Sequence, residues 1–263
     1  MIPFKIYQVF SKEEIGFKGN TAAVVLLEDP LEPAEMQTIA ADLSQPATTF
    51  LRYEKGSWSA RWFAPDEEIP LCGHGAFAGF AFLKDQGSMQ QSVLLNYTGG
   101  SLNGYVNNSS ISLSLSAIPT LKKINPPKAI QEGLNIPILE MYETSNKHLI
   151  VTKRASHVEN MDPNFSKLRE SKIFGYTVTA PGYDVDFVSR TLVPHVNQLE
   201  DHATGSSHAI LTPYWADRLK RRNMTGKQLS KRGGYFECEL YANQVNLSGE
   251  SKLIAKGEVI VHH

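Results

Sequence analysis

The sequence has little cysteine, no extended run of basic residues and no long apolar segment. Its two cysteines, Cys72 and Cys238, are too few among 263 residues for the disulfide framework of a small secreted domain. The 26 Lys and Arg residues nearly balance 27 Asp and Glu residues, for a net charge of −1, and the longest basic run is residues 220–222. Nucleic acid is therefore not expected as the main partner.

The N-terminal residues do not combine a basic segment with a following apolar one, as a signal peptide would. No stretch is long enough to span a membrane as an apolar helix. We therefore expect a cytoplasmic protein without membrane contact. The composition, 41% hydrophobic and 20% charged, is ordinary for a globular protein, and the length allows two modest domains.

The most informative stretch leads from a predicted strand at residues 57–63, through a proline-bounded turn, to Gly73-His74-Gly75. We call residues 73–75 the first elbow. Residues 76–83, which follow it, carry no polar side chain on any face, so we expect them to form a buried helix. The free N–H groups and the positive dipole end of that helix predict an anion site, in which His74 can titrate beside a bound acid.

A second stretch repeats this design. A strand ending at Pro194 is followed by the second elbow, residues 205–207, and then by a largely apolar helix that begins near His208. The spacing from proline to elbow differs between the two stretches by only three residues. Two similar halves, each with an anion-binding elbow, predict one site where the halves meet. The alternative is two unrelated buried helices with ordinary glycine caps.

The chain in order reads as an α+β protein. Each half is a run of strands around one buried helix, and not an alternating array of strands and helices. The proline-bounded segment 119–127 is the best candidate linker, so we expect one domain at residues 1–118 and another at 119–263. The last strand is free to return to the first domain, and Ser248-Gly249 is expected to be a turn.

These motifs resemble those of the PhzF family, whose namesake is an isomerase of phenazine biosynthesis and whose fold is shared with diaminopimelate epimerase. Three segments carry most of the resemblance: Gly19-Asn20-Thr21-Ala22-Ala23-Val24, Pro70-Leu71-Cys72-Gly73-His74, and Glu200-Asp201-His202-Ala203-Thr204-Gly205-Ser206. The third departs from the family pattern at His202, which stands in place of a proline. The C-terminal pattern is also similar, and the resemblance covers nearly the whole chain.

The resemblance implies two similar domains, each a curved, barrel-like β-sheet wrapped around a central buried helix. It also implies a homodimer with its site in the cleft between the domains, and cofactor-independent acid/base proton transfer on a small carboxylate-bearing metabolite. No metal and no cofactor are implied. By position, the catalytic residues would be His74 and Asp201, and the substrate would contact Gly73, Gly75, Gly205, Ser206 and Gln45.

One residue of the family pattern is missing. The catalytic carboxylate of the family is a Glu in a Ser-Glu-Thr-x-Phe motif, and here that stretch runs from Ser44 to Phe50. Counting forward from Ser44 puts Gln45 in the Glu position, whereas counting back from Phe50 puts Ala47 there. Neither side chain can exchange a proton near pH 7.

Two functions are therefore compatible with the sequence. The chain is an isomerase-type enzyme that works through His74 and Asp201, or a catalytically impaired small-anion binding protein on the same fold. The sequence favours the enzyme, because both elbows and the two titratable residues are kept.

Other polar residues are weaker candidates for a functional site. A two-thiol racemase is excluded, because Thr204 stands where such an enzyme needs the thiol that would partner Cys72. His195, His202 and His208 fit no metal-ligand spacing. Glu68 either orients the first elbow or belongs to a solvated acidic turn.

Overall fold

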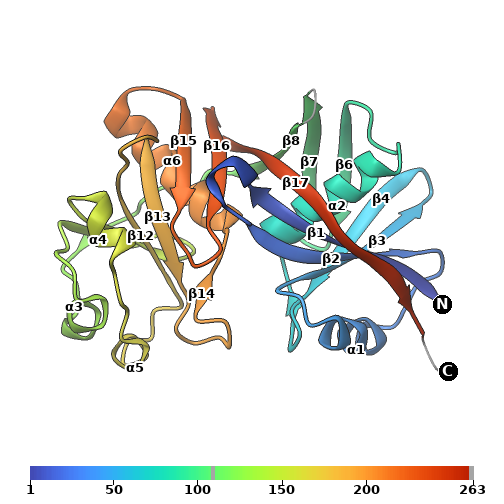
Figure 1. Ribbon diagram of the computed structural model, residues 1–263, viewed down its shortest axis with the longest axis horizontal. Coiled ribbons are helices and arrows are strands. Elements are labelled where there is room, and N and C mark those ends of the chain that lie inside the picture. Colours follow the sequence, from blue (N-terminus) through green and yellow to red (C-terminus); the bar gives the residue numbers. More distant parts are fainter. Residues whose placement is uncertain (108–109, 261–263) are drawn as a thin grey trace. The chain divides into compact units, whose positions relative to one another are not determined.

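The computed structural model describes residues 1–107 and 110–260 (Figure 1). The chain forms two compact units. The first contains Met1–Ser114 together with the segment from Ser248 onward, and the second contains Leu115–Leu247. This division places the last part of the chain with the N-terminal unit. Among the residues described, no helix is both long enough and apolar enough to cross a membrane.

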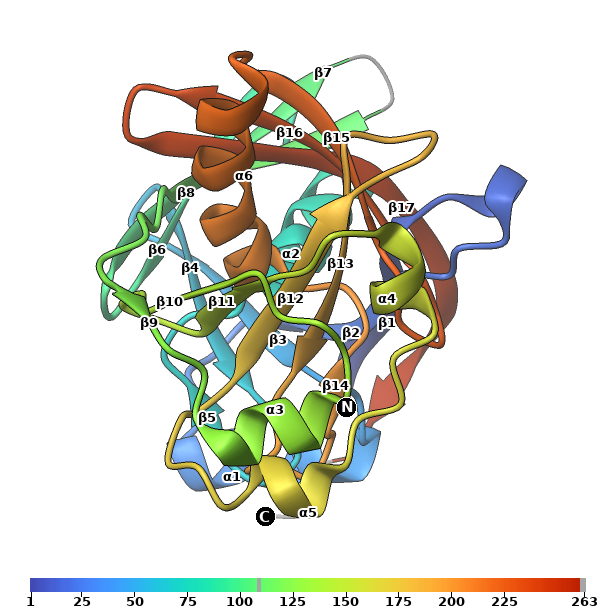
Figure 2. The same cartoon turned by 90° about the vertical axis from the view of Figure 1, so that its left-hand side faces the viewer.

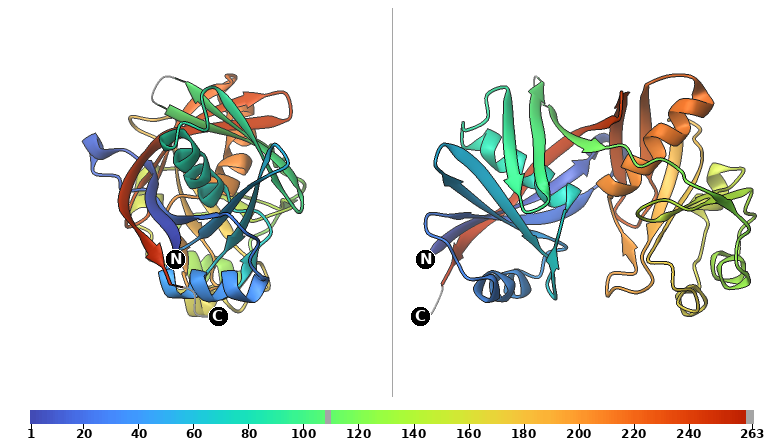
Figure 3. Two further views of the ribbon diagram at one scale, coloured as in Figure 1. Left: turned by 90° about the vertical axis from the view of Figure 1, so that its right-hand side faces the viewer. Right: turned by 180° about the vertical axis from the view of Figure 1, so that it is seen from behind.

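The first unit is a curved sheet around the helix α2. Its elements are β1 (Ile2–Ser11), η1 (Glu13–Ile15), β2 (Asn20–Leu27), α1 (Pro33–Leu43), β3 (Thr48–Glu54), β4 (Ser57–Phe63), β5 (Glu68–Ile69), α2 (Gly73–Asp85), β6 (Ser92–Tyr97), β7 (Gly100–Asn107), β8 (Ser110–Ser116) and the later part of β17 (Gln244–Val259). The strands pair in the order β1, β2, β3, β4, β6, β7, β8 and β17, and β17 also pairs with β1. The sheet therefore closes around α2 (Figure 3).

The second unit repeats this arrangement around the helix α6. Its elements are β9 (Lys123–Ile124), α3 (Lys128–Leu134), β10 (Glu140–Tyr142), β11 (His148–Val151), α4 (Ala155–Glu159), α5 (Phe165–Leu168), β12 (Tyr176–Pro181), β13 (Phe187–Leu192), β14 (Glu200–Asp201), α6 (Gly205–Leu219), β15 (Asn223–Gln228), β16 (Gly234–Tyr241) and the start of β17. Strand pairs β11–β12, β12–β13, β13–β15 and β15–β16 alternate between parallel and antiparallel. Pairs β2–β3, β3–β4, β4–β6 and β6–β7 alternate in the same order. The α+β architecture expected from the sequence is confirmed.

Side-chain alternation gives β12 and β13 two different faces. On one face, Tyr176, Val178, Val188 and Leu192 belong to an apolar cluster that α3, α4 and α5 cover (Figure 2). The opposite face, toward α6, is unusually polar, and its fully buried side chains include Thr177, Thr179, Ser189 and Thr191. The hydroxyls of Thr177 and Thr191 donate to Ser207, and that of Thr179 accepts from Trp215 Nε1, so this face holds α6 through specific hydrogen bonds as well as through packing.

A proline lies inside α6 without ending it. Pro213 has no N–H to donate to the carbonyl oxygen of Ala209, one turn earlier. The backbone N–H of Ile118 donates to that oxygen instead, at 2.9 Å. The helix therefore continues to Leu219 because the acceptor that proline leaves open is satisfied by another segment.

The expected turn at Ser248-Gly249 is wrong. Both residues lie inside β17, and the chain reverses before it, where Ala242 adopts a left-handed conformation with φ of 51°. Glu250 pairs with Ser11 of β1, and the Ser248 hydroxyl lies 2.6 Å from that of Ser112 in β8. Pairing with strands distant in sequence overrides the local turn preference of Ser-Gly.

The second buried helix carries a fully buried histidine. The His208 Nδ1 lies 2.9 Å from the carbonyl oxygen of Thr204, and its ring stacks on Phe236 with centroids 3.5 Å apart. A carbonyl oxygen only accepts, so Nδ1 carries the proton. Burial lowers the pKa of His208 to about 4, because the charged imidazolium would lose its hydration.

This burial predicts acid sensitivity of the second unit. Above pH 6.5 His208 is neutral in the folded and the unfolded chain, so it adds no pH dependence. Between pH 6.5 and about 4 only the unfolded chain binds the proton, which lowers the free energy of unfolding by up to about 3 kcal/mol. Urea unfolding at pH 7, 5.5 and 4.5 should show a smaller decline for His208→Met than for the unchanged protein. His195→Gln, which removes an exposed histidine, is the control, and equal declines in all three proteins would contradict the prediction.

Candidate functional site

The first elbow begins the buried helix α2. Cys72 is its N-cap, with φ of −121° and ψ of 107°, and its Sγ accepts from the backbone N–H of Gly75 at 3.4 Å. Residues 74–83 of the helix are all buried. The sequence-based expectation of a buried helix here is confirmed, with the glycine-rich elbow forming its first turn.

His74 lies in this first turn, with 9% of its surface exposed. Its Nδ1 is 3.5 Å from Cys72 Sγ, so the imidazole is held against the N-cap residue of the same helix. An imidazole can both take up and release a proton near neutral pH. The position is therefore suitable for acid/base chemistry at a helix N-terminus that favours anions.

Gly75 allows the helix to approach the sheet closely. A Cβ atom at this position would lie 2.8 Å from Trp62 Cδ1 and 3.1 Å from the Thr49 hydroxyl oxygen. The Thr49 hydroxyl donates to the carbonyl oxygen of Gly75 at 2.9 Å. A larger residue would push the first turn, including His74, away from β3 and β4.

The two candidates for the missing carboxylate differ in their surroundings. Ala47 is fully buried, and its carbonyl oxygen accepts from Ala23 N–H at 2.9 Å, which continues the β2–β3 pairing. It lies two residues before Thr49, and alternation therefore places both on the face toward α2. Gln45 is half-buried, and its side-chain amide donates to the carbonyl oxygen of Leu43 at 3.1 Å.

Glu68 forms an ion pair with Arg61. Its carboxylate accepts two hydrogen bonds from the guanidinium of Arg61, at 2.8 and 2.7 Å. These hydrogen bonds hold the pKa of Glu68 below its ordinary value. Glu68 thus belongs to a largely exposed ion pair that joins β5 to β4.

The second elbow has the same backbone form as the first. Its N-cap, Thr204, has φ of −118° and ψ of 105°, within a few degrees of Cys72. Ser207 occupies the place of Gly75, and its hydroxyl oxygen accepts from Thr177 at 2.9 Å and from Thr191 at 2.8 Å. Ser206 occupies the place of His74 and is half-buried. The two elbows therefore present different chemistry from equivalent positions.

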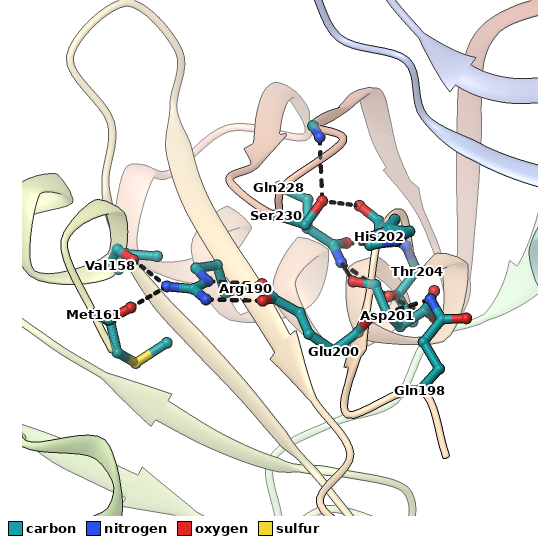
Figure 4. Close-up of polar contacts among 11 residues, drawn as sticks. Val158, Met161, Arg190, Gln198, Glu200, Asp201, His202, Thr204, Gln228 and Ser230 are labelled. Carbon is teal, nitrogen blue, oxygen red and sulfur yellow. Dashed lines mark hydrogen bonds and ion pairs between the residues drawn. The ribbon is translucent and has the colours of Figure 1, made fainter. Parts of the chain in front are cut away.

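Asp201 is held beside the second elbow by a directed chain of hydrogen bonds (Figure 4). The amide nitrogen of Gln228 donates to the Thr204 hydroxyl oxygen at 3.0 Å, and that hydroxyl donates to Asp201 Oδ2 at 2.8 Å. Gln228 also donates to the Asp201 carbonyl oxygen at 2.6 Å and accepts from Thr204 N–H at 2.9 Å. The fully buried Gln228 thus fixes both the backbone and the carboxylate of Asp201.

A second anchor holds β14, which carries Asp201. Glu200 and Arg190 form two hydrogen bonds, at 2.7 and 2.8 Å, with side chains only 18% and 12% exposed. The Arg190 guanidinium also donates to the carbonyl oxygens of Met161 and Val158 (Figure 4). Bidentate pairs of this kind fix geometry as well as charge. The backbone at Asp201 is therefore tied to β13 and to the segment around α4.

The structure assembles the sequence-predicted site residues as two groups, one in each unit. Gly73, His74 and Gly75 form the first turn of α2, while Gly205 and Ser206 begin α6 and Asp201 lies shortly before it in β14. That both groups line one cleft stays a prediction. Gln228 was not predicted as a site residue, because a single glutamine outside any motif carries no signal in the sequence. Lys147 was not predicted either, because a lone lysine in a turn is ordinarily solvated.

His195, His202 and His208, the histidines considered as metal ligands, have different surroundings. His208 is buried in the second unit, His195 is exposed, and the pKa of the half-buried His202 is lowered by burial. In the described part of the chain, no group of three His, Cys, Asp or Glu side chains is placed to hold a metal ion.

The hydrogen bonds of Gln228 predict a measurable loss of stability. Gln228→Leu would leave Thr204 N–H and the Asp201 carbonyl without these partners in a buried place. We expect the free energy of unfolding to fall by about 2–4 kcal/mol, measured by urea unfolding. Gln131→Leu, at an exposed position of α3, should change it by less than about 0.5 kcal/mol. Equal effects of the two substitutions would show that the Gln228 amide does not hold the elbow.

Known proteins match this chain along nearly its whole length. It is 31% identical, over 266 residues, to an uncharacterized isomerase of Halalkalibacterium halodurans, covering 99% of this chain and 100% of that protein. The crystal structure of a PhzF-family phenazine biosynthesis protein from Enterococcus faecalis matches with a TM-score of 0.93 and 35% identity, covering 99% of both chains.

More distant structures share the fold alone. A hydroxyproline epimerase of Agrobacterium vitis, solved with trans-4-hydroxy-L-proline bound, matches with a TM-score of 0.66 at 8% identity, covering 97% of this chain and 91% of that one.

The family model described as phenazine biosynthesis-like protein matches residues 7–257. The chain therefore belongs to the PhzF, or phenazine biosynthesis-like, family.

Proposed function

We propose that this protein is a cofactor-independent isomerase that moves a proton on a small carboxylate-bearing metabolite. The observation that carries the proposal is the pair of equivalent elbows with unlike residues. One presents the imidazole of His74, and the other holds Asp201 through Thr204. Membership of the family, and relatives described as isomerases, support the same reaction class.

The proposed roles follow from the chemistry of each residue. His74 takes the proton from one atom of the substrate and returns it to another, because imidazole is the side chain best suited to accept and release a proton near neutral pH. Asp201 is the acidic group at the second elbow, where Thr204 and Gln228 hold it in one orientation. The N–H groups at the two helix starts favour the negative charge of the substrate.

A second candidate, binding of a small anion without turnover, is favoured by one observation. Ala47 and Gln45 are the residues available at the family's Glu position, and neither exchanges protons near pH 7. General acid/base catalysis contributes about 10²–10⁴-fold to rates. We therefore expect no efficient isomerisation of dihydro-hydroxyanthranilate, the substrate of the family's namesake.

Proton exchange distinguishes the two candidates. Incubation of a panel of small carboxylic acids in D₂O, followed by proton NMR, should reveal deuterium incorporation into at least one compound. His74→Asn should reduce that exchange by at least about 100-fold, as for loss of a general base, while binding of the compound changes little. His195→Asn, at an exposed histidine, is the control and should leave exchange unchanged.

The outcomes separate as follows. Binding without exchange by the unchanged protein would favour the anion-binding protein over the isomerase. Exchange that persists in His74→Asn would show that another residue carries the proton.

Restoring a carboxylate gives a complementary prediction. Ala47→Glu should increase the rate on dihydro-hydroxyanthranilate by about 10²–10⁴-fold, because position 47 lies on the strand face toward α2. Gln45→Glu should give a smaller gain, since the side chain at position 45 folds back toward Leu43. Ala47→Gln matches the size of the new side chain without its proton chemistry and should gain nothing. A gain with Gln45→Glu alone would assign the Glu position to residue 45.

A further inference from the structure

Lys147 is a buried lysine at the second elbow. It lies in the bend just before β11, with only 5% of its surface exposed. Its Nζ donates to the hydroxyl oxygen of Ser206 and to the side-chain oxygen of Asn146, each at 2.8 Å. Lysines are rarely buried to this extent, so the placement of this charge at the start of α6 needs an explanation.

The internal repeat shows what differs between the two elbows. In the second unit His148 pairs with Tyr176, and in the first unit Ala23 pairs with Thr48. Lys147 precedes His148, and Ala22 precedes Ala23, so Lys147 and Ala22 occupy equivalent positions. The second elbow therefore has a lysine where the first has an alanine, although the strand pairing is the same in both units.

A glycine accommodates the lysine side chain. A Cβ atom at Gly175 would lie 3.3 Å from Lys147 Cγ and 2.9 Å from the carbonyl oxygen of Leu192. By the same register, Gly175 corresponds to Ala47 of the first unit. The missing side chain at position 175 thus leaves room for the stem of Lys147 to run toward Ser206.

The hydrogen bond between Lys147 and Ser206 has a fixed direction. An ammonium group has three N–H donors and no acceptor, so the Ser206 oxygen must accept. The hydroxyl proton of Ser206 then points to a different acceptor. A carboxylate at the N-terminus of α6 is such an acceptor, and it would also meet the charge of Lys147 and the positive end of the helix dipole.

We propose that Lys147 is a positioning residue that makes the second elbow selective for a carboxylate, by orienting the Ser206 hydroxyl as a donor and by adding positive charge. This inference rests on the proposed function and deepens it. It assigns recognition of the carboxylate of the substrate to the second elbow. Neutral analogues of the same shape should bind less well, because they do not supply the negative charge that the ammonium group and the helix N-terminus attract.

The test compares carboxylates with their amides. Acetate, propionate and benzoate, and the three corresponding amides, are titrated into the unchanged protein and four variants, with binding followed by calorimetry and thermal shift. The unchanged protein should prefer at least one carboxylate to its amide by 10-fold or more. Lys147→Met should lose most of that preference, and Lys147→Arg, which keeps the charge and the donors, should retain it in part. Lys153→Met removes an exposed positive charge from the same unit and should keep the full preference.

Ser206→Ala keeps the inference testable even if Lys147→Met does not fold. It should lower the preference by about 10-fold with Lys147 in place, as expected for loss of one hydrogen bond to a charged group. An unchanged preference in Lys147→Met or in Ser206→Ala would overturn the inference, as would equal binding of acids and amides by the unchanged protein.

Binding and turnover separate the two proposals. Loss of carboxylate preference in Lys147→Met, in a protein that shows no proton exchange on any acid, would support the inference while the proposed isomerase fails. Full proton exchange together with an unchanged carboxylate preference in Lys147→Met would support the proposed isomerase and overturn the inference about Lys147.

Discussion

Each unit depends on one constraint, a central helix that is buried over most of its length. The ten residues 74–83 of α2 leave no polar face for solvent, so strands have to surround the helix. In the first unit β17 meets the requirement by pairing with both β1 and β8, which closes the sheet. The helix N-terminus is then the one part of α2 where backbone N–H groups lack helical partners, and the elbow is there.

The same constraint is met differently in the second unit. The sheet face toward α6 carries hydroxyl and amide groups that bond directly to the elbow residue Ser207, from Thr177 and Thr191, or to its N-cap Thr204, from Gln228. An apolar contact tolerates small shifts of a helix, whereas a directed hydrogen bond does not. The second elbow is thereby fixed in orientation, and with it Asp201. In the first unit the corresponding precision comes from the close approach of Gly75 to Trp62 and from the hydrogen bond that the Thr49 hydroxyl donates to the Gly75 carbonyl oxygen.

The two elbows share one backbone form but carry different side chains, so each can have a different role in the proposed reaction. Equivalent positions carry His74 in one unit and Ser206 in the other, and Ser206 has a buried lysine beside it. An imidazole suits proton transfer, and a lysine-oriented hydroxyl suits recognition of a negative group. In the reaction that we propose, the fold supplies two similar anion-favouring helix ends, and a few substitutions assign their roles.

The sequence by itself determined the two buried helices, their glycine elbows and the family, because an uninterrupted apolar run and two long motifs depend only on neighbouring residues. Tertiary structure decided what long-range pairing controls. Ser248 and Gly249 read as a turn but lie in β17, because β1 and β8 pair with that strand. Lys147 lies 59 positions from Ser206 in the chain, and no local pattern marks it. Only the parallel pairing of β11 with β12 and the open space at Gly175 bring its ammonium to the second elbow.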